Sequence, residues 1–176
     1  MNFPILETER LRLRMWKEED FEAYADICAD PQVMQYLGKG QTLSRPEAWR
    51  HMAFLAGHWH LRGFGHWALE EKENRRLVGR LGFLQPEGWP GFEIGWTLAR
   101  SVWGKGYATE GAKCALQYAF DEMGKEHVIS LIHPDNAASV KVAQRLGESF
   151  EQEVEITGIP VMVYGLWKAQ WVKQQG

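Results

Sequence analysis

Cysteine is scarce in this sequence: Cys28 and Cys114 are the only two among 176 residues. Neither belongs to a C-x-x-C motif or to a metal-ligand spacing. Two histidines that share a predicted helix face, His51 and His58, stand roughly 10 Å apart at about 1.5 Å per residue, which is too far for one metal ion. We therefore expect reduced thiols and no metal site, and we interpret Cys114 as a core residue rather than an acylated nucleophile.

Long apolar runs and clusters of one charge are also missing. No stretch approaches the roughly 18 apolar residues of a membrane span, and charges begin where a signal peptide needs an apolar segment. The net charge is −3 and no long run of Lys or Arg occurs, so the basic footprint of a nucleic-acid-binding protein is absent. These absences predict a cytoplasmic protein with no membrane partner and no nucleic-acid partner.

What the sequence does have is the composition of an ordinary globular protein. Hydrophobic residues make up 45% and charged residues 24% of the chain, as in typical folded domains. A chain of this length buries a sizeable core without disulfides or metal. We expect residues 1–176 to form one domain, without an internal repeat or linker.

The first half of the chain shows one clear strand and one clearly capped helix. Leu11, Leu13 and Met15 alternate with three arginines, which predicts a half-buried strand over 10–15 with the arginines on the outer face. Ser44 and Glu47 have the spacing of a capping box, and Gly63 is a natural stop. The apolar stripe of the helix between them is expected at Trp49, Met52, Ala53, Ala56 and Trp59.

The remaining elements follow from periodicity and turn signals. A helix is predicted from about residue 18, then a short helical piece after Pro31. Strands are predicted over 66–70, 77–83, 92–98 and 128–132, helices after the loop at 104–110 and over 136–146, and a hairpin over 150–156 and 161–167. The order β-α-α-β-β-β-α-β-α-β-β is an α+β fold, with a mixed central sheet of about seven strands flanked by helices.

The loop at 104–110 joins a strand to a helix and carries Gly104 and Gly106. Small residues let consecutive backbone N–H groups point into one concavity, and the following helix adds its unpaired amides and its positive dipole end. The pattern indicates either a phosphate or pyrophosphate site or a tight turn with no ligand. It matches neither the G-x-x-x-x-G-K-[ST] loop of nucleoside triphosphatases nor the G-x-G-x-x-G loop of dinucleotide-binding folds.

Three motifs in order resemble the GNAT acyltransferase superfamily, in the branch typified by the ribosomal-protein alanine N-acetyltransferases RimJ and RimL. They are EIGWTL at 93–98, WGKGYATE at 103–110 and NAAS at 136–139, and the opening TERLRLRMW is similar too. The resemblance covers essentially the whole chain. It implies a GNAT-like fold and an acetyl-CoA-dependent N-acetyltransferase, which needs no metal and transfers acetyl directly from the thioester to a primary amine through a tetrahedral intermediate. The acceptor would be a protein N-terminus or a small amine, and the protein a monomer or homodimer.

The resemblance also assigns residues to coenzyme A. The family signature [Q/R]-x-x-G-x-[G/A] places Gly106 and Ala108 at its last two marked positions and Trp103 where Gln or Arg is usual, so Trp103 is expected to frame the loop. The backbone N–H groups expected to hold the pyrophosphate are those of Gly104, Lys105, Gly106, Ala108 and Thr109. The strand residues expected along the pantetheine arm are Trp96, Thr97 and Leu98. Arg100, Lys105 and Arg145 could add charge or be ordinary surface residues.

The candidates for chemistry are few. Glu93 stands where many GNAT enzymes carry a catalytic base, although it could also be a solvated strand residue; His133 is a second candidate base. Asn136 caps a helix and by resemblance contacts the pantetheine arm. Ser139, one turn on, is the candidate to protonate the leaving thiolate, because Ala143 stands where other members of the family carry a tyrosine.

Two other functions remain open at this level. One is an acyl-CoA-binding sensor without catalysis on the same fold, and the other is a phosphate-binding module for a different nucleotide. The acceptor side is expected between the helices before His66 and the C-terminal hairpin. Its suggested lining is His51, Trp59, His66 and Trp89.

Overall fold

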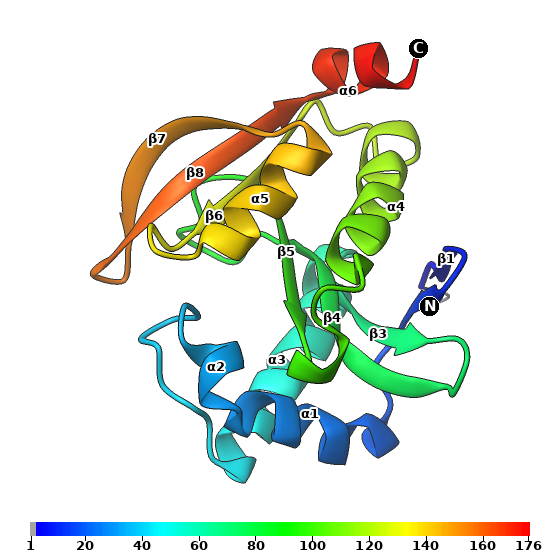
Figure 1. The fold of residues 1–176 in the computed structure, drawn as a ribbon, viewed down its shortest axis with the longest axis vertical. Helices are drawn as coiled ribbons and strands as arrows, with labels where there is room; N and C mark the ends of the chain where they lie inside the picture. The colour runs from blue at the N-terminus through cyan, green and yellow to red at the C-terminus, as the bar shows by residue number, and fades with distance from the viewer. Residues whose placement is uncertain (1–2) are drawn as a thin grey trace.

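A computed structural model describes residues 3–176 of the chain as one eight-stranded sheet with helices on both faces (Figure 1). The sheet order is β1-β2-β3-β4-β5-β6-β8-β7. The strands are β1 Leu6–Glu7, β2 Leu11–Arg14, β3 His66–Glu71, β4 Arg76–Leu84, β5 Glu93–Leu98, β6 His127–Ile132, β7 Ser149–Ile156 and β8 Ile159–Trp167. The helices are α1 Phe21–Ala29, α2 Pro31–Met34, α3 Arg45–Arg62, α4 Tyr107–Asp121, α5 Ala137–Leu146 and α6 Lys168–Gln175.

The predicted α+β class, the mixed sheet and the order of the main elements are confirmed. All neighbouring strands are antiparallel except β5 and β6. The structure adds an eighth strand, β1, and a C-terminal helix, α6, which the sequence did not predict. Two residues are too short for a strand pattern, and α6 has only Trp171 buried, so neither element leaves a periodic apolar signal.

The two faces of the sheet bury different helices. On one face, α4 packs against Leu11, Leu69, Leu81 and Ile94 of β2–β5. Its fully buried residues are Ala112, Ala115, Leu116, Ala119 and Phe120. On the other face, α1 and α3 pack together over Ala68 of β3. In Figure 1 helices α1–α3 gather at the bottom of the view and strands β6–β8 at the top, with β5 between them.

The predicted stripe of α3 is wrong in part. Its capping box at Ser44 and its left-handed stop at Gly63 are present. The buried residues are Ala48, Met52, Leu55, His58 and Trp59, whereas Trp49 is 54% exposed. The buried line runs at spacings of three and four residues from Ala48, and Trp49 lies beside that line on the solvent side.

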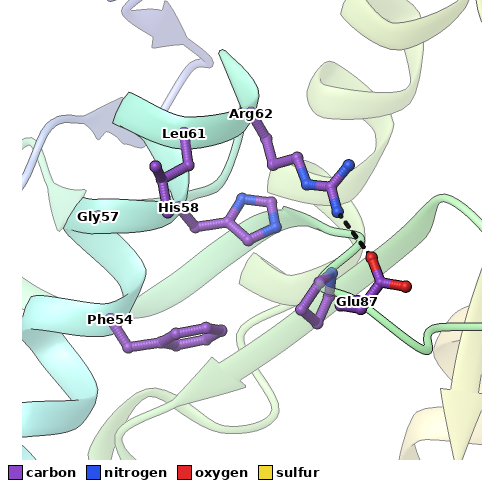
Figure 2. A pocket seen from close by; sticks show the side chains of 7 residues that line it. Phe54, Gly57, His58, Leu61, Arg62 and Glu87 are labelled. Carbon is purple, nitrogen blue, oxygen red and sulfur yellow. Dashed lines mark ion pairs between the residues drawn. The ribbon is translucent and has the colours of Figure 1, made fainter.

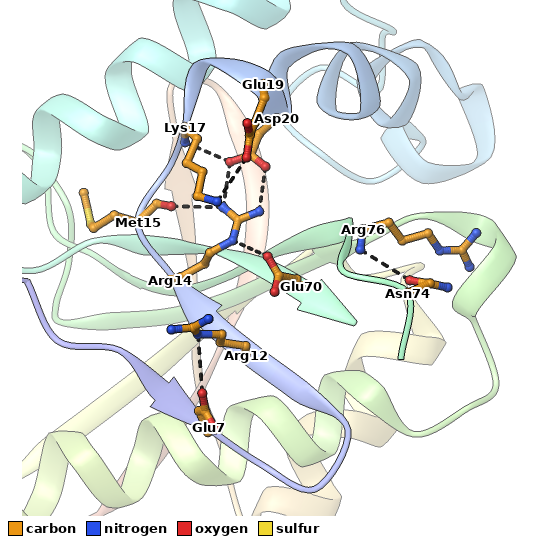
Figure 3. A network of polar contacts seen from close by, with 10 residues as sticks. All are labelled: Glu7, Arg12, Arg14, Met15, Lys17, Glu19, Asp20, Glu70, Asn74 and Arg76. Atoms are coloured by element: carbon orange, nitrogen blue, oxygen red, sulfur yellow. Dashed lines mark hydrogen bonds and ion pairs between the residues drawn. The ribbon is translucent and has the colours of Figure 1, made fainter. Parts of the chain in front are cut away.

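The expectation that Arg10, Arg12 and Arg14 all lie on the outer face of this strand is wrong for Arg14. The Arg14 side chain is buried and binds Asp20 through both terminal nitrogens and Glu70 through Nε (Figure 3). The short turn Glu18–Asp20 and helix α1 cover this face of the strand, so the guanidinium needs carboxylate partners. Alternation shows that a strand has two faces, but it does not show that a helix covers the polar one.

Candidate active site

The central feature of the site is the separation of β5 from β6. These parallel strands pair only at Glu93 and Ile129, while β5 pairs along its whole length with β4 on its other edge. Phe92 accepts a hydrogen bond from the Ile129 amide, and beyond that point the backbone ladder ends. The Ser130 hydroxyl continues the contact instead, since it lies 3.2 Å from the Ile94 carbonyl oxygen.

The separation leaves backbone groups of β5 without strand partners. Because neighbouring residues of a strand point their backbone groups to opposite sides, Trp96 directs its N–H and C=O toward β6, as Phe92 and Ile94 do. The Leu98 carbonyl on the same edge accepts a hydrogen bond from the Trp103 indole at 3.0 Å. Thr97 directs its carbonyl toward Gly79 of β4, so it would contact a ligand through its side chain. Trp96 therefore offers the free amide and carbonyl that an amide-rich chain could pair with.

The glycine loop has the conformation of an anion site. Gly104 and Gly106 both adopt left-handed backbone angles, with φ of 77° and 81°, and α4 begins directly after Gly106. None of the N–H groups of residues 104–109 donates to another described residue, because the first helical bond of α4 is donated by Glu110. These donors, at the positive end of a long helix, fit a pyrophosphate.

Two cations near the loop are engaged by carboxylates. Lys105 Nζ lies 3.5 Å from Glu71 Oε1, and Arg100 Nε lies 2.9 Å from Asp30 of the α1–α2 junction. Arg145 is exposed on α5. The loop is thus built mainly from backbone donors, with Trp103 fixed beside it by its bond to Leu98.

Helix α5 brings Asn136 and Ser139 to the end of β6. The Asn136 side chain accepts a hydrogen bond from the Ser139 amide at 3.2 Å, so the predicted helix cap is confirmed. The Ser139 hydroxyl makes no hydrogen bond with any described residue, and its side chain is half-buried. Ala143 is fully buried against Ile132 and Tyr164, so this position has no room for a tyrosine.

Glu93 occupies the point where β5 and β6 separate. Its carboxylate accepts a hydrogen bond from the Trp89 indole. Burial raises the pKa of Glu93 to about 7, against the opposing effects of the Trp89 bond, the charge of Arg80 and the Leu131 amide. A carboxyl with this pKa is poised to take a proton near neutral pH.

His133, the second candidate base, lies at the end of β6. Its Nδ1 accepts a hydrogen bond from the Asp135 amide at 3.2 Å, and its ring lies 5.3 Å from that of Tyr36. This nitrogen is committed to the turn, so it is not free to accept another proton.

A second buried carboxyl, Glu148, was not predicted from the sequence. It is 4% exposed, and its Oε1 lies 3.1 Å from the Ser130 hydroxyl, which also faces the Ile94 carbonyl. The Ser130 hydroxyl has one proton and can donate it to only one of these two oxygens. When it donates to the Ile94 carbonyl, a protonated Glu148 donates to the Ser130 oxygen. Burial raises the pKa of Glu148 to about 8. Glu148 follows the helix stop Gly147, where sequence pattern indicates only a loop.

The face of β3–β5 that points away from α4 carries a cluster of polar side chains under α1 and α3. Arg80 Nη1 lies 2.7 Å from His66 Nδ1, and Tyr24 Oη lies 2.7 Å from His51 Nδ1. Of the residues suggested to line the acceptor side, Trp59 is instead a core residue, 1% exposed, which donates to the His66 carbonyl. Arg80 was missed, since one arginine in an apolar strand gives no distinguishing signal.

A separate shallow pocket lies over the outer side of α3 and the β4–β5 loop (Figure 2). Phe54, His58 and Leu61 line it, and the ion pair of Arg62 with Glu87 closes one side. Both ring nitrogens of His58 are occupied, by the Phe64 carbonyl and the Gln85 amide. No predicted site residue lines this pocket, and we assign it no role in the chemistry.

Two absences hold for residues 3–176. No group of three or more His, Cys, Asp or Glu side chains in this range could hold a metal ion. No helix in this range is long and apolar enough to cross a membrane. Cys114, expected in the core, is only partly buried at the edge of α4.

Comparisons with known proteins place this geometry in a family. The family described as the acetyltransferase (GNAT) domain matches residues 10–149. YkkB of Bacillus subtilis (strain 168) is 30% identical over 167 residues, which cover 90% of this chain and 93% of YkkB.

Solved structures agree with the sequence comparison. An acetyltransferase from Agrobacterium tumefaciens str. C58 is 29% identical, covers 94% of this chain and 95% of its own, and superposes with a TM-score of 0.83. RimL, a ribosomal L7/L12 alpha-N-protein acetyltransferase in complex with coenzyme A, is 20% identical and shares the fold, with a TM-score of 0.76 over 93% of this chain and 98% of its own. As its motifs predict, the chain belongs to the GNAT acetyltransferase family.

Proposed function

We propose that this protein transfers the acetyl group of acetyl-CoA directly to a primary amine, with Glu93 as the general base. The family uses acetyl-CoA, which supplies an activated acetyl thioester. The observation that carries the proposal is the position of Glu93, a carboxyl with a pKa of about 7 where β5 leaves β6. A thioester in the gap between these strands would lie beside that carboxyl.

The residues proposed to hold coenzyme A lie along this gap. The N–H groups of Gly104, Lys105, Gly106, Ala108 and Thr109 would bind the pyrophosphate, because they are unpaired at the start of α4. The backbone of Trp96 would pair with the pantetheine arm, and Asn136 would border it from α5. An N–H of β5 directed into the gap would stabilise negative charge on the thioester oxygen.

The two proton transfers fall to different side chains in this proposal. An amine arrives mainly as ammonium at neutral pH, and Glu93 would accept its proton, directly or through one water. The free hydroxyl of Ser139 would donate a hydrogen bond to the departing thiolate. Glu93 lies on β5 and Ser139 on α5, so the proposed base and the proposed acid come from different elements.

The experiment that tests the proposal measures thiol release from acetyl-CoA across a panel of amines and peptides, with the acetylated products identified by mass spectrometry. The proposal expects thiol release that depends on an amine, matched by an N-acetyl product. A protein that binds coenzyme A in calorimetry but acetylates nothing in the panel would be the non-catalytic sensor. Binding of ATP or NAD in preference to coenzyme A would contradict the assignment of the loop.

A further inference from the structure

The face of the sheet next to Glu93 carries a guanidinium without a carboxylate partner. Arg80 lies on β4, half-buried, and no Asp or Glu of residues 3–176 lies within 4.0 Å of its nitrogens. Among residues 3–176, its one side-chain hydrogen bond runs from Nη1 to His66 Nδ1. Even a partly buried cation usually has an anionic partner, because removing it from water is costly. This environment therefore suits an anion supplied from outside the chain.

The tautomer of His66 follows from the same contact. Arginine remains protonated and can only donate, so His66 Nδ1 accepts and the neutral ring carries its proton on Nε2. His66 is 1% exposed, and Nε2 has no hydrogen-bond partner among the described residues. Burial and the neighbouring Arg80 charge keep the pKa of His66 well below its usual value, so the ring stays neutral. An unpaired, buried N–H donor thus stands beside the guanidinium.

A third donor comes from the neighbouring strand. Thr97 of β5 is directly opposite Arg80 in the antiparallel register, so the two side chains lie on one face. Its hydroxyl is buried and also lacks a partner among the described residues. On the other side of Arg80 the register partner is Ala68, whose small side chain leaves space for the guanidinium.

Gly95 keeps the space between these donors and Glu93 open. A β-carbon on Gly95 would lie 3.3 Å from His66 Nε2 and 3.6 Å from Glu93 Oε1. His66, one of the donors, and the proposed base therefore border the same small space above the strand. A ligand that reaches both needs an anionic group and an amine separated by only a few bonds.

We infer that the acceptor is an amine that carries a carboxylate close to its amino group, as a free amino acid does, and that Arg80, His66 and Thr97 bind this carboxylate. The inference rests on the proposed acetyl transfer for its catalytic meaning, but the binding site is defined by its own residues. Arg80 offers a planar fork to the carboxylate, and the His66 and Thr97 donors fit its remaining lone pairs. Glu93 would then face the amine.

The test compares each proteinogenic L-amino acid with its primary amide, as two mixtures incubated with protein and acetyl-CoA. The amide has the more reactive amine at neutral pH, since its amino group has the lower pKa, so a preference for the acid reports recognition of the carboxylate. We expect kcat/KM for the best acid to exceed that of its amide by at least about 10-fold, as a charged hydrogen bond provides. Equal rates, or faster acetylation of the amide, would overturn the inference and leave the proposed function standing.

Variants of Arg80 test whether the preference for the acid over the amide comes from this residue. Arg80→Gln should lower kcat/KM for the acid by about 10- to 100-fold more than for the amide, since any rise in the pKa of Glu93 on losing the Arg80 charge slows both substrates alike. Arg80→Lys should recover part of the loss, and Arg50→Gln, an exposed arginine on α3, should change neither substrate. An equal loss for acid and amide in a folded Arg80→Gln protein would show that Arg80 supports the fold or Glu93 instead.

A binding measurement separates this inference from the proposed function. Calorimetry of the protein saturated with coenzyme A, titrated with the same acid and amide, needs no turnover. Tighter binding of the acid supports the inference even if no acetyl group is transferred. Equal binding of the pair contradicts it, whatever the rate, and that result holds even if Arg80→Gln fails to fold.

Discussion

Ser139 carries the simplest test at the scale of single residues. Its hydroxyl is free, whereas its backbone amide is the group that binds Asn136. Ser139→Ala should therefore preserve the helix cap and lower kcat by about 10- to 100-fold, the effect of losing one hydrogen bond to a charged group. The measurement is kcat under conditions where amine nucleophilicity limits the rate.

Two controls accompany Ser139→Ala. Coenzyme A affinity and melting temperature should stay close to those of the unchanged protein, and Ser149→Ala, at an exposed serine of β7, should change nothing. A Ser139→Ala enzyme with unchanged kcat would mean that water or the newly formed ammonium protonates the thiolate.

Glu148 makes a separate prediction about stability. The folded protein holds the Glu148 proton up to a pH of about 8, while the unfolded chain releases it near the ordinary value of 4.5. Between these values the folded state binds more protons, so the free energy of unfolding falls as pH rises. Glu148→Gln removes this loss. Across this window the free energy of unfolding should fall by ~2–4 kcal/mol less in Glu148→Gln than in the unchanged protein, measured by urea unfolding.

The control for Glu148 is another glutamate changed in the same way. Glu153 is exposed on β7, so Glu153→Gln should leave the slope of unfolding free energy against pH as it is. Glu93 titrates in the same window but is present in all three proteins. A slope unchanged by Glu148→Gln would show that this carboxyl is ionised in the folded state.

At the scale of elements, the strand-to-helix connection before α4 is predicted to bind an anion through its backbone. Gly104 has a left-handed φ, and a β-carbon there would meet nothing within 4 Å, so a side chain fits without a steric clash. Gly104→Asp places a negative charge beside the proposed pyrophosphate, and Gly104→Asn places a neutral group of the same shape. We expect Asp to weaken coenzyme A binding at least about 10-fold more than Asn, from charge repulsion.

Gly124, in the turn after α4, provides the matched control for this loop. It also has a left-handed φ and open space around its β-carbon position. Gly124→Asp should introduce backbone strain similar to that of Gly104→Asp and leave coenzyme A affinity unchanged in calorimetry. Equal affinities for Gly104→Asp and Gly104→Asn would place the pyrophosphate elsewhere.

The elements also show what sequence could and could not predict. Glycine and asparagine at helix ends predicted the boundaries of α3 and α5 well, because Gly63, Gly147 and Asn136 act locally. The separation of β5 from β6 could not be predicted from the residues of these two strands. It depends on pairing between segments distant in the sequence, and no local pattern in either strand encodes it.

At the scale of the whole molecule, the fold follows from alternation and helical periodicity, and the chemistry from contacts across the sheet. The glycine loop and Glu93 could be found by motif. Arg80, His66 and Glu148 could not be grouped beforehand, since strand register brings Arg80 to His66 and a helix end brings Glu148 to Ser130. Burial of His66, which lowers its pKa, and of Glu148, which raises its pKa, is likewise a property of the assembled sheet and helices.

The most direct test of the central claim is the pH dependence of kcat for the wild-type protein and Glu93→Gln. The claim is that Glu93, with a pKa of about 7, accepts the proton of the amine. Between about pH 5 and 9, wild-type kcat should rise with pH and level off above about 7. In Glu93→Gln the rise of kcat below about pH 7 should disappear, and the plateau kcat should be about 10²- to 10⁴-fold lower, with unchanged coenzyme A affinity. The same acid limb in both proteins would contradict the assignment of Glu93 as the base.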